Sequence, residues 1–115
     1  PLTVYGDGSQ VRDYVYVKDI AEAYVKVLEG SLPNLTVLNV ATGDPLTNRQ
    51  IAEEISIRIN NAEIKFVPDP RGEDQRKRSV GDSSKIKRLL DWSPKWSFDE
   101  ALDRVITYWK VSDNG

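Results

Sequence analysis

The sequence contains no cysteine, no histidine and no methionine among its 115 residues. Without cysteine the chain cannot form a disulfide framework or a thiolate metal site, and without histidine it lacks the commonest metal ligand and general base. The lack of cysteine fits a reducing compartment, so we expect a cytoplasmic location. Because methionine is absent, we also expect the chain to be a fragment of a longer protein.

Long apolar runs and an excess of positive charge are also missing. No run approaches the roughly 20 apolar residues that a membrane span requires, and no signal peptide is visible, so we expect no membrane association. The formal net charge is −2, which argues against a general nucleic-acid binder because no global positive field attracts phosphates. Charged residues make up 30% and hydrophobic residues 39% of the chain, a mix typical of one small globular domain.

A glycine-rich turn at residues 6–9 separates two short apolar runs near the start of the chain. Apolar and polar residues alternate over residues 11–17, which predicts a strand, and Asp19 offers a cap to a following helix. Arg12 would then lie on ordered backbone, which suits a planar guanidinium that grips a phosphate or carboxylate. A surface ion pair between Arg12 and Asp13 or Asp19 is an equally good interpretation of these residues alone.

The rest of the sequence alternates strand and helix patterns. Period-two or buried apolar runs predict further strands at residues 2–5, 36–40 and 64–67. Apolar residues at helical spacing, with N-cap residues before them, predict helices that begin at Asp19, Thr47, Asp82 and Ser97. The charged residues 71–78 lie between these elements, and we interpret them as a solvated loop rather than as a groove for a polyanion.

Two patterns that suggest catalysis or sugar stacking have structural alternatives. Tyr14 and Lys18 match Tyr-x-x-x-Lys, but on a strand this spacing separates the two side chains by about 13 Å, too far to act on one substrate. We therefore do not interpret them as a catalytic pair. The three tryptophans could form a platform for a sugar, yet Trp92 and Trp109 fall on apolar helical faces, which favours packing for them, with Trp96 left open.

Four segments resemble, in the same order, the C-terminal half of the extended short-chain dehydrogenases/reductases. These are the NAD-dependent nucleotide-sugar epimerases and dehydratases, and UDP-glucose 4-epimerase is their best-known member. The matching segments are residues 1–19, 38–43, 70–76 and 82–94. The resemblance implies an α/β fold, specifically the substrate-binding portion of such an enzyme. It also implies that residues 36–60 supply an edge strand and helix to the Rossmann sheet of the intact protein, whose N-terminal NAD-binding half is absent here.

The resemblance also implies roles for six residues in binding the nucleotide. Two arginines would contact the diphosphate, a carboxylate would contact the ribose, the strand before the glycine turn would present its backbone to the base, and a tyrosine would lie beside the nucleotide. In that order these are Arg12 and Arg71, Asp74, Thr3 and Tyr5, and Tyr14. The 4-epimerases usually have Pro-Gly-Asp after the second arginine, whereas this chain has Gly72-Glu73-Asp74, so Glu73 is an alternative partner for the ribose.

From this resemblance we expect the chain to bind a nucleotide sugar, with a UDP-sugar favoured, as part of a 4-epimerase. A 4,6-dehydratase, another epimerase of the same family, and a non-catalytic nucleotide-binding or interaction module are the alternatives. NAD would bind the intact protein but not this chain alone, and the chain alone would be inactive. We expect the intact protein to be a homodimer and the isolated chain to self-associate through apolar surfaces that the missing half would cover.

Overall fold

Four helices and five short strands form the part of the chain that the computed structural model describes, residues 1–72 and 77–113. The strands are β1 (Leu2–Tyr5), β2 (Val11–Arg12), β3 (Leu46–Thr47), β4 (Ile64–Val67) and β5 (Arg78–Ser79). The helices are α1 (Val17–Glu29), α2 (Asn48–Arg58), α3 (Ser84–Leu90) and α4 (Phe98–Asp113). This mixture confirms the predicted α/β class.

The strands form two small sheets. In the first, β1 pairs in parallel with β4, with Leu2 opposite Ile64. In the second, β2 lies between β3, to which it is antiparallel, and β5, to which it is parallel. Arg12 lies opposite Leu46 on one side and Ser79 on the other, so strands on both sides fix the backbone that carries its guanidinium.

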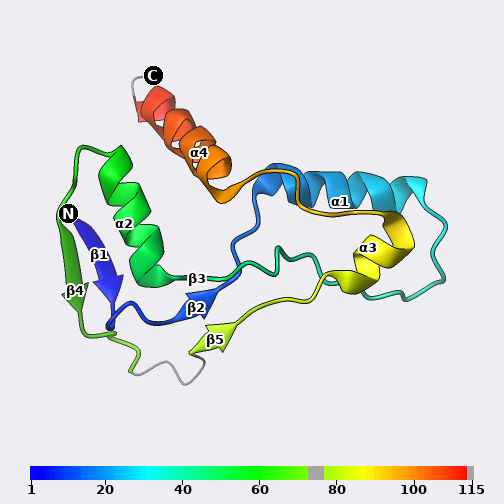
Figure 1. Cartoon of the computed structure of the whole chain (residues 1–115), viewed down its shortest axis with the longest axis horizontal. Helices are drawn as coiled ribbons and strands as arrows, with labels where there is room; N and C mark the ends of the chain where they lie inside the picture. The colour runs from blue at the N-terminus through cyan, green and yellow to red at the C-terminus, as the bar shows by residue number, and fades with distance from the viewer. Residues whose placement is uncertain (73–76, 114–115) are drawn as a thin grey trace.

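The chain is open rather than tightly packed. Figure 1 shows β1, β4 and α2 at one end, α1 and α3 at the other, and the β2 sheet between them, with α4 running alongside α2. The radius of gyration is 16.9 Å, whereas a compact domain of this length has a value of about 13 Å. The two ends therefore meet mainly through the central sheet, and each has its own packing.

The core of the α1 and α3 end is built around Trp92, which is fully buried with Ala23 and Ile86. The indole Nε1 of Trp92 donates a hydrogen bond of 2.9 Å to the backbone oxygen of Asp19. The Asp19 carboxylate is also buried, and it accepts a hydrogen bond from the backbone nitrogen of Lys95 at 2.9 Å. Asp19 therefore joins the first helix to the segment before α4.

This placement corrects the prediction that residues 11–17 form a strand and that Asp19 caps the next helix. The strand ends at Arg12, and α1 begins at Val17 with Tyr16 as its N-cap residue. The strand ends early because the Asp13 side chain turns to bind the loop at Thr42, which takes the chain out of the sheet. Tyr14 and Lys18 therefore belong to different local structures.

The predicted strand at residues 36–40 is also wrong, since these residues have no regular secondary structure. A strand requires a neighbour that accepts and donates its backbone hydrogen bonds, and the described residues pair none with this segment. Leu38 and Val40 nevertheless pack against the Trp92 core. Val37, in the same segment, is 75% exposed.

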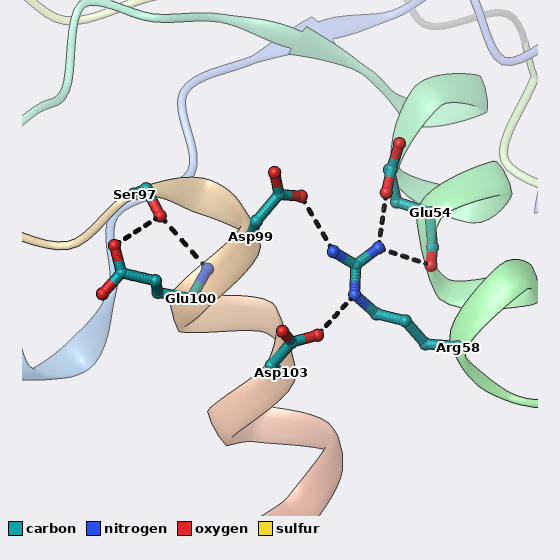
Figure 2. A network of polar contacts seen from close by, with 6 residues as sticks. All are labelled: Glu54, Arg58, Ser97, Asp99, Glu100 and Asp103. Carbon is teal, nitrogen blue, oxygen red and sulfur yellow. Dashed lines mark hydrogen bonds and ion pairs between the residues drawn. The ribbon is translucent and has the colours of Figure 1, made fainter.

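The local helix signals were more successful. Thr47 and Gln50 form the predicted capping box at the start of α2. At the start of α4 the Ser97 hydroxyl accepts a hydrogen bond from the Glu100 nitrogen at 3.2 Å, and it donates one to the Glu100 carboxylate (Figure 2). Asp82 lies one residue before the N-cap of α3, where its carboxylate accepts from the Ser84 nitrogen.

A network of ion pairs holds α4 against α2. Arg58, near the end of α2, donates to the Asp99 carboxylate at 2.8 Å and to the Asp103 carboxylate at 2.6 Å, and it also contacts Glu54 in its own helix (Figure 2). The hydrogen bonds from Arg58 to Asp103 and Glu54 raise the pKa of the guanidinium, against the opposing effect of desolvation. One cation thus bridges the two helices.

Candidate functional site

The five predicted site residues that the structure describes line a single pocket of about 620 Å³. They come from β1, from β2 and the turn after it, and from the loop that follows β4, and they are Thr3, Tyr5, Arg12, Tyr14 and Arg71. The sixth, Asp74, lies outside the described residues, as does its alternative Glu73. The fold therefore brings together residues from segments that are far apart in the sequence.

Three polar residues that the sequence analysis did not single out also line this pocket: Gln10, Asn48 and Asp69. Asn48 is the first residue of α2, directly after the N-cap residue Thr47. The capping box in the sequence marks this helix start, and it could therefore have pointed to Asn48. Asp69 lies two residues before Arg71 and could have been noted from that spacing. An apolar wall completes the pocket and comprises Leu2, Val4, Ile51, Ala52 and Ile55.

The glycine turn brings the loop after β1 close to α2 and β4. Gly8 has a φ of +77°, and a Cβ added there would lie 3.0 Å from the Arg49 Cβ and 3.1 Å from the Phe66 ring. The Gly8 oxygen accepts a hydrogen bond from the Arg49 nitrogen at 3.0 Å. Only glycine combines this positive φ with so close an approach. The turn thereby sets where β2 begins, and hence where Arg12 lies.

The side chain of Arg12 is half-buried, and its Nη1 donates a hydrogen bond to the Val11 oxygen at 2.9 Å. The neighbouring Asp13 accepts hydrogen bonds from Thr42 and Gly43. Together with the strand pairing of β2, these contacts restrain the backbone at Arg12. A restrained guanidinium loses less conformational entropy when it binds an anion.

Arg71 extends from a tight turn that Asp69 stabilises. The Asp69 carboxylate accepts hydrogen bonds from the Arg71 backbone nitrogen at 2.9 Å, from Nε at 3.0 Å and from Nη2 at 3.0 Å. The bonds from the Arg71 side chain and backbone lower the pKa of Asp69 and outweigh its desolvation. The pocket therefore contains an ionised carboxylate beside its second arginine.

Tyr14 and Asn48 meet across the pocket, where the Tyr14 hydroxyl donates to the Asn48 Oδ1 at 2.9 Å. Burial raises the pKa of Tyr14, although nearby Arg12 acts in the opposite direction. The hydroxyl thus stays protonated near neutral pH and serves as a donor. Lys18 lies in the first turn of α1 with its Nζ 5.4 Å from the centre of the Trp96 ring, whereas the Tyr14 hydroxyl bonds Asn48, so the two groups of the Tyr-x-x-x-Lys match have different partners.

A second, more apolar pocket of about 670 Å³ lies between the start of α1 and one face of α4. Trp96 lines it, and Tyr14 lines both pockets. The prediction that tryptophans serve packing is confirmed for Trp92, which is 0% exposed, but it is wrong for Trp109, which is 61% exposed. Trp109 contacts Tyr108 edge-on with ring centres 5.6 Å apart.

The described residues do not fit the usual binding site for a dinucleotide. Such a site places a pyrophosphate where a glycine-rich turn leads from a strand into a helix N-terminus. Here the turn with Gly6 and Gly8 leads from β1 into another strand, and no other turn in residues 1–72 and 77–113 contains two glycines between a strand and a helix. Within the same ranges no group of three acidic residues is arranged to hold a metal ion, and no helix is long and apolar enough to span a membrane.

Comparisons of the sequence with known proteins point to one family. A sequence model of the family described as GDP-mannose 4,6 dehydratase matches residues 1–105. The low-salt glycan biosynthesis protein Agl12 of Haloferax volcanii is 39% identical over an alignment that covers 97% of this chain and 36% of that protein.

Two solved structures share the fold. The UDP-glucose 4-epimerase of Thermotoga maritima, solved with UDP-glucose, matches with a TM-score of 0.86 and 30% identity over 96% of this chain and 35% of its own. The dTDP-glucose 4,6-dehydratase DesIV of Streptomyces venezuelae, solved with NAD, matches with a TM-score of 0.84 and 29% identity over 95% of this chain and 34% of its own. The chain thus spans about a third of the length of these relatives.

The matched residues 1–105 include β1, the glycine turn, β2 with Arg12 and the loop that follows β4, which are segments that build the first pocket. The matches include both epimerases and dehydratases, so the resemblance seen in the sequence is confirmed at the level of the family. The chain belongs to the GDP-mannose 4,6 dehydratase family of NAD-dependent nucleotide-sugar epimerases and dehydratases.

Proposed function

We propose that the first pocket binds the nucleoside diphosphate part of a nucleotide sugar, with a UDP-sugar as the preferred ligand. The observation that carries this proposal is that Arg12 and Arg71, from distant segments, line one pocket together with β1. The diphosphate is the most highly charged part of such a ligand. Two guanidiniums on one diphosphate make charge-assisted hydrogen bonds, each roughly twice as strong as a neutral one.

The other pocket residues fit the remaining parts of the ligand. Thr3 and Tyr5 lie on β1, whose backbone groups can pair with the edge of a base. The Tyr14 hydroxyl, held by Asn48, lies beside the nucleotide in this arrangement. Asp74 remains our proposed ribose partner, with Glu73 as the alternative. The apolar residues of α2 form the wall against which a base or sugar packs.

We propose 4-epimerisation as the reaction of the protein that contains this chain, with 4,6-dehydration as the second candidate. The solved UDP-glucose 4-epimerase supports the first and binds UDP-glucose. The family description and the dTDP-glucose dehydratase support the second. NAD would bind in the rest of that protein, because the described residues contain no dinucleotide turn. On this proposal the chain alone binds substrate but neither binds NAD tightly nor catalyses turnover.

A titration of UDP and UDP-glucose into single alanine variants of the intact protein tests the pocket. Loss of Arg12 or Arg71 should weaken binding about 10- to 150-fold, because each removes a charge-assisted contact worth about 1.5 to 3 kcal/mol. Lysine should not restore full affinity, because a point charge cannot replace the planar fork. Arg78→Ala is the matched control, since Arg78 is exposed on β5 and does not line the pocket.

The two outcomes are distinct. If replacing either pocket arginine weakens binding no more than replacing Arg78 does, the basic residues act only as a diffuse surface charge and the proposal fails.

The reaction is decided separately by incubating the intact protein with NAD and UDP-glucose and identifying the product by NMR. UDP-galactose would establish epimerisation, whereas a 4-keto-6-deoxy sugar would establish dehydration.

A further inference from the structure

Asp69 stands out because it places a carboxylate inside a pocket proposed to hold a dianionic diphosphate. Its side chain is 9% exposed, whereas that of its partner Arg71 is 80% exposed. The Asp69 carboxylate forms an ion pair of 3.0 Å with the Arg71 guanidinium, and it also accepts the hydrogen bond from the Arg71 backbone nitrogen. A hydrogen bond of 3.0 Å from the Gly72 nitrogen to the Asp69 backbone oxygen closes the same turn.

We propose that Asp69 is a positioning residue that aims Arg71 at the diphosphate, an inference that rests on the proposed function. A guanidinium has two edges that can each make paired hydrogen bonds with an oxyanion. Asp69 takes the edge formed by Nε and Nη2. The carboxylate therefore sets the plane and the direction of the guanidinium that we expect the diphosphate to meet.

Three features of the turn make this orientation specific. Pro70 lies between the two residues and fixes its own φ, which limits how the turn can rearrange. The carboxylate also binds the Arg71 backbone nitrogen, so it fixes both ends of the arginine side chain. The Asp69 side chain is itself only 9% exposed, which limits its freedom to turn away from Arg71. Arg71 is thus held before the ligand arrives, which reduces the entropy lost on binding.

The carboxylate has an opposite effect that makes the inference testable. Taken alone, a negative charge beside the diphosphate repels it, so Asp69 should favour binding only through Arg71. In the presence of Arg71, Asp69→Asn should weaken binding of UDP about three- to tenfold, a coupling typical of groups in direct contact. In an Arg71→Ala background the same substitution should strengthen binding or leave it unchanged, because only the repulsion remains.

The experiment is a double-mutant cycle in the intact protein, with UDP affinity measured by calorimetry for the parent, D69N, R71A and D69N/R71A. Asp82→Asn is the matched control: Asp82 also accepts a hydrogen bond from the backbone nitrogen two residues on, at 2.9 Å, but it lies outside the pocket. It should leave UDP affinity unchanged. Uridine, which lacks phosphates, should bind the parent and D69N equally well.

Each outcome has one meaning. Weaker UDP binding by D69N that disappears in the R71A background supports the positioning role. An equal loss in both backgrounds, or a loss for uridine as well, shows that Asp69 only supports the fold and overturns the inference. Tighter UDP binding by D69N also overturns it, since the carboxylate would then compete with the ligand. If R71A itself has no effect, the proposed function fails at Arg71 and the inference fails with it.

Discussion

The Asp13 carboxylate accepts two hydrogen bonds from Thr42, one of 2.6 Å from the hydroxyl and one of 2.9 Å from the backbone nitrogen. A third, of 2.8 Å, comes from the Gly43 nitrogen. These bonds attach the residue directly after Arg12 to a loop 29 positions along the chain. The orientation of the proposed diphosphate contact therefore depends on a neighbour that itself does not line the pocket.

Replacing Asp13 with asparagine should destabilise the protein by about 2 kcal/mol, because hydrogen bonds to a charged acceptor are lost. Desolvation raises the pKa of Asp13, but the bonds from Thr42, Gly43 and Gly81 together lower it below the ordinary 3.8. The stabilisation is therefore fully present well above pH 3.8 and is lost as the pH falls through the lower folded value. Urea unfolding at several pH values measures this.

In the Asp13→Asn variant the acid-induced loss of stability should be shallower than in the parent. Asp44→Asn is the control, because Asp44 is an exposed carboxylate of the same loop. If the Asp13 and Asp44 substitutions change the pH dependence equally, the hydrogen bonds to Thr42 and Gly43 contribute nothing specific.

Replacing Trp92 with phenylalanine should lower the free energy of unfolding by about 2 to 4 kcal/mol. The change removes buried volume and leaves the backbone oxygen of Asp19 without its indole donor. Trp109→Phe removes an indole from an exposed position and should cost less than about 0.5 kcal/mol. Thermal unfolding followed by circular dichroism compares the two, and similar costs would contradict the assigned core.

Replacing Arg58 with alanine should loosen α4 from α2, since it removes the cation that contacts Asp99 and Asp103. We expect a loss of about 1 to 2 kcal/mol at low salt, and a smaller loss at about 1 M NaCl because the carboxylates are largely exposed. Hydrogen exchange of the α4 amides should rise selectively. Lys95→Ala breaks an exposed pair with Glu22 and provides the control. Uniform exchange across the chain would argue against a bridge between these helices.

Replacing Gly8 with alanine should destabilise the protein more than replacing Gly72 with alanine. Both glycines have positive φ, but an added Cβ at Gly8 lies 3.0 Å from the Arg49 Cβ, whereas one at Gly72 meets no atom within 4 Å of the described chain. Gly72→Ala should therefore lower the free energy of unfolding by the backbone strain alone, about 1 kcal/mol. Gly8→Ala should lower it by that strain and also by the cost of displacing α2. Equal chemical denaturation midpoints would contradict the close approach at Gly8.

The isolated 115-residue chain should self-associate in solution. Large apolar side chains lie exposed on α1 and beside it, including Leu28 at 84% and Val37 at 75% exposed. Faces of this kind seek partners. Sedimentation velocity should show dimers or larger species that increase with concentration, and Leu28→Lys should reduce them. A monomer at all concentrations, with no binding of a dye that reports apolar surface, would contradict this expectation.

The sequence by itself determined the features that depend on neighbouring residues. The capping box of Thr47 and Gln50, the strand before the glycine turn and the apolar faces of the helices are local patterns, because their hydrogen bonds and side-chain contacts form within a few residues. The motif resemblance likewise predicted that Arg12 and Arg71 act on one ligand, and both line the same pocket.

Only the tertiary structure decided the features that depend on distant segments. Asp19 has the sequence signature of an N-cap, yet it is buried because the backbone of Lys95 supplies its donor. Residues 36–40 have the composition of a buried strand, but composition cannot provide a neighbouring strand. Asn48 reaches the pocket because Tyr14, 34 residues away, donates to it. Burial and hydrogen-bond pairing across such separations are set by how the elements pack, which no local pattern encodes.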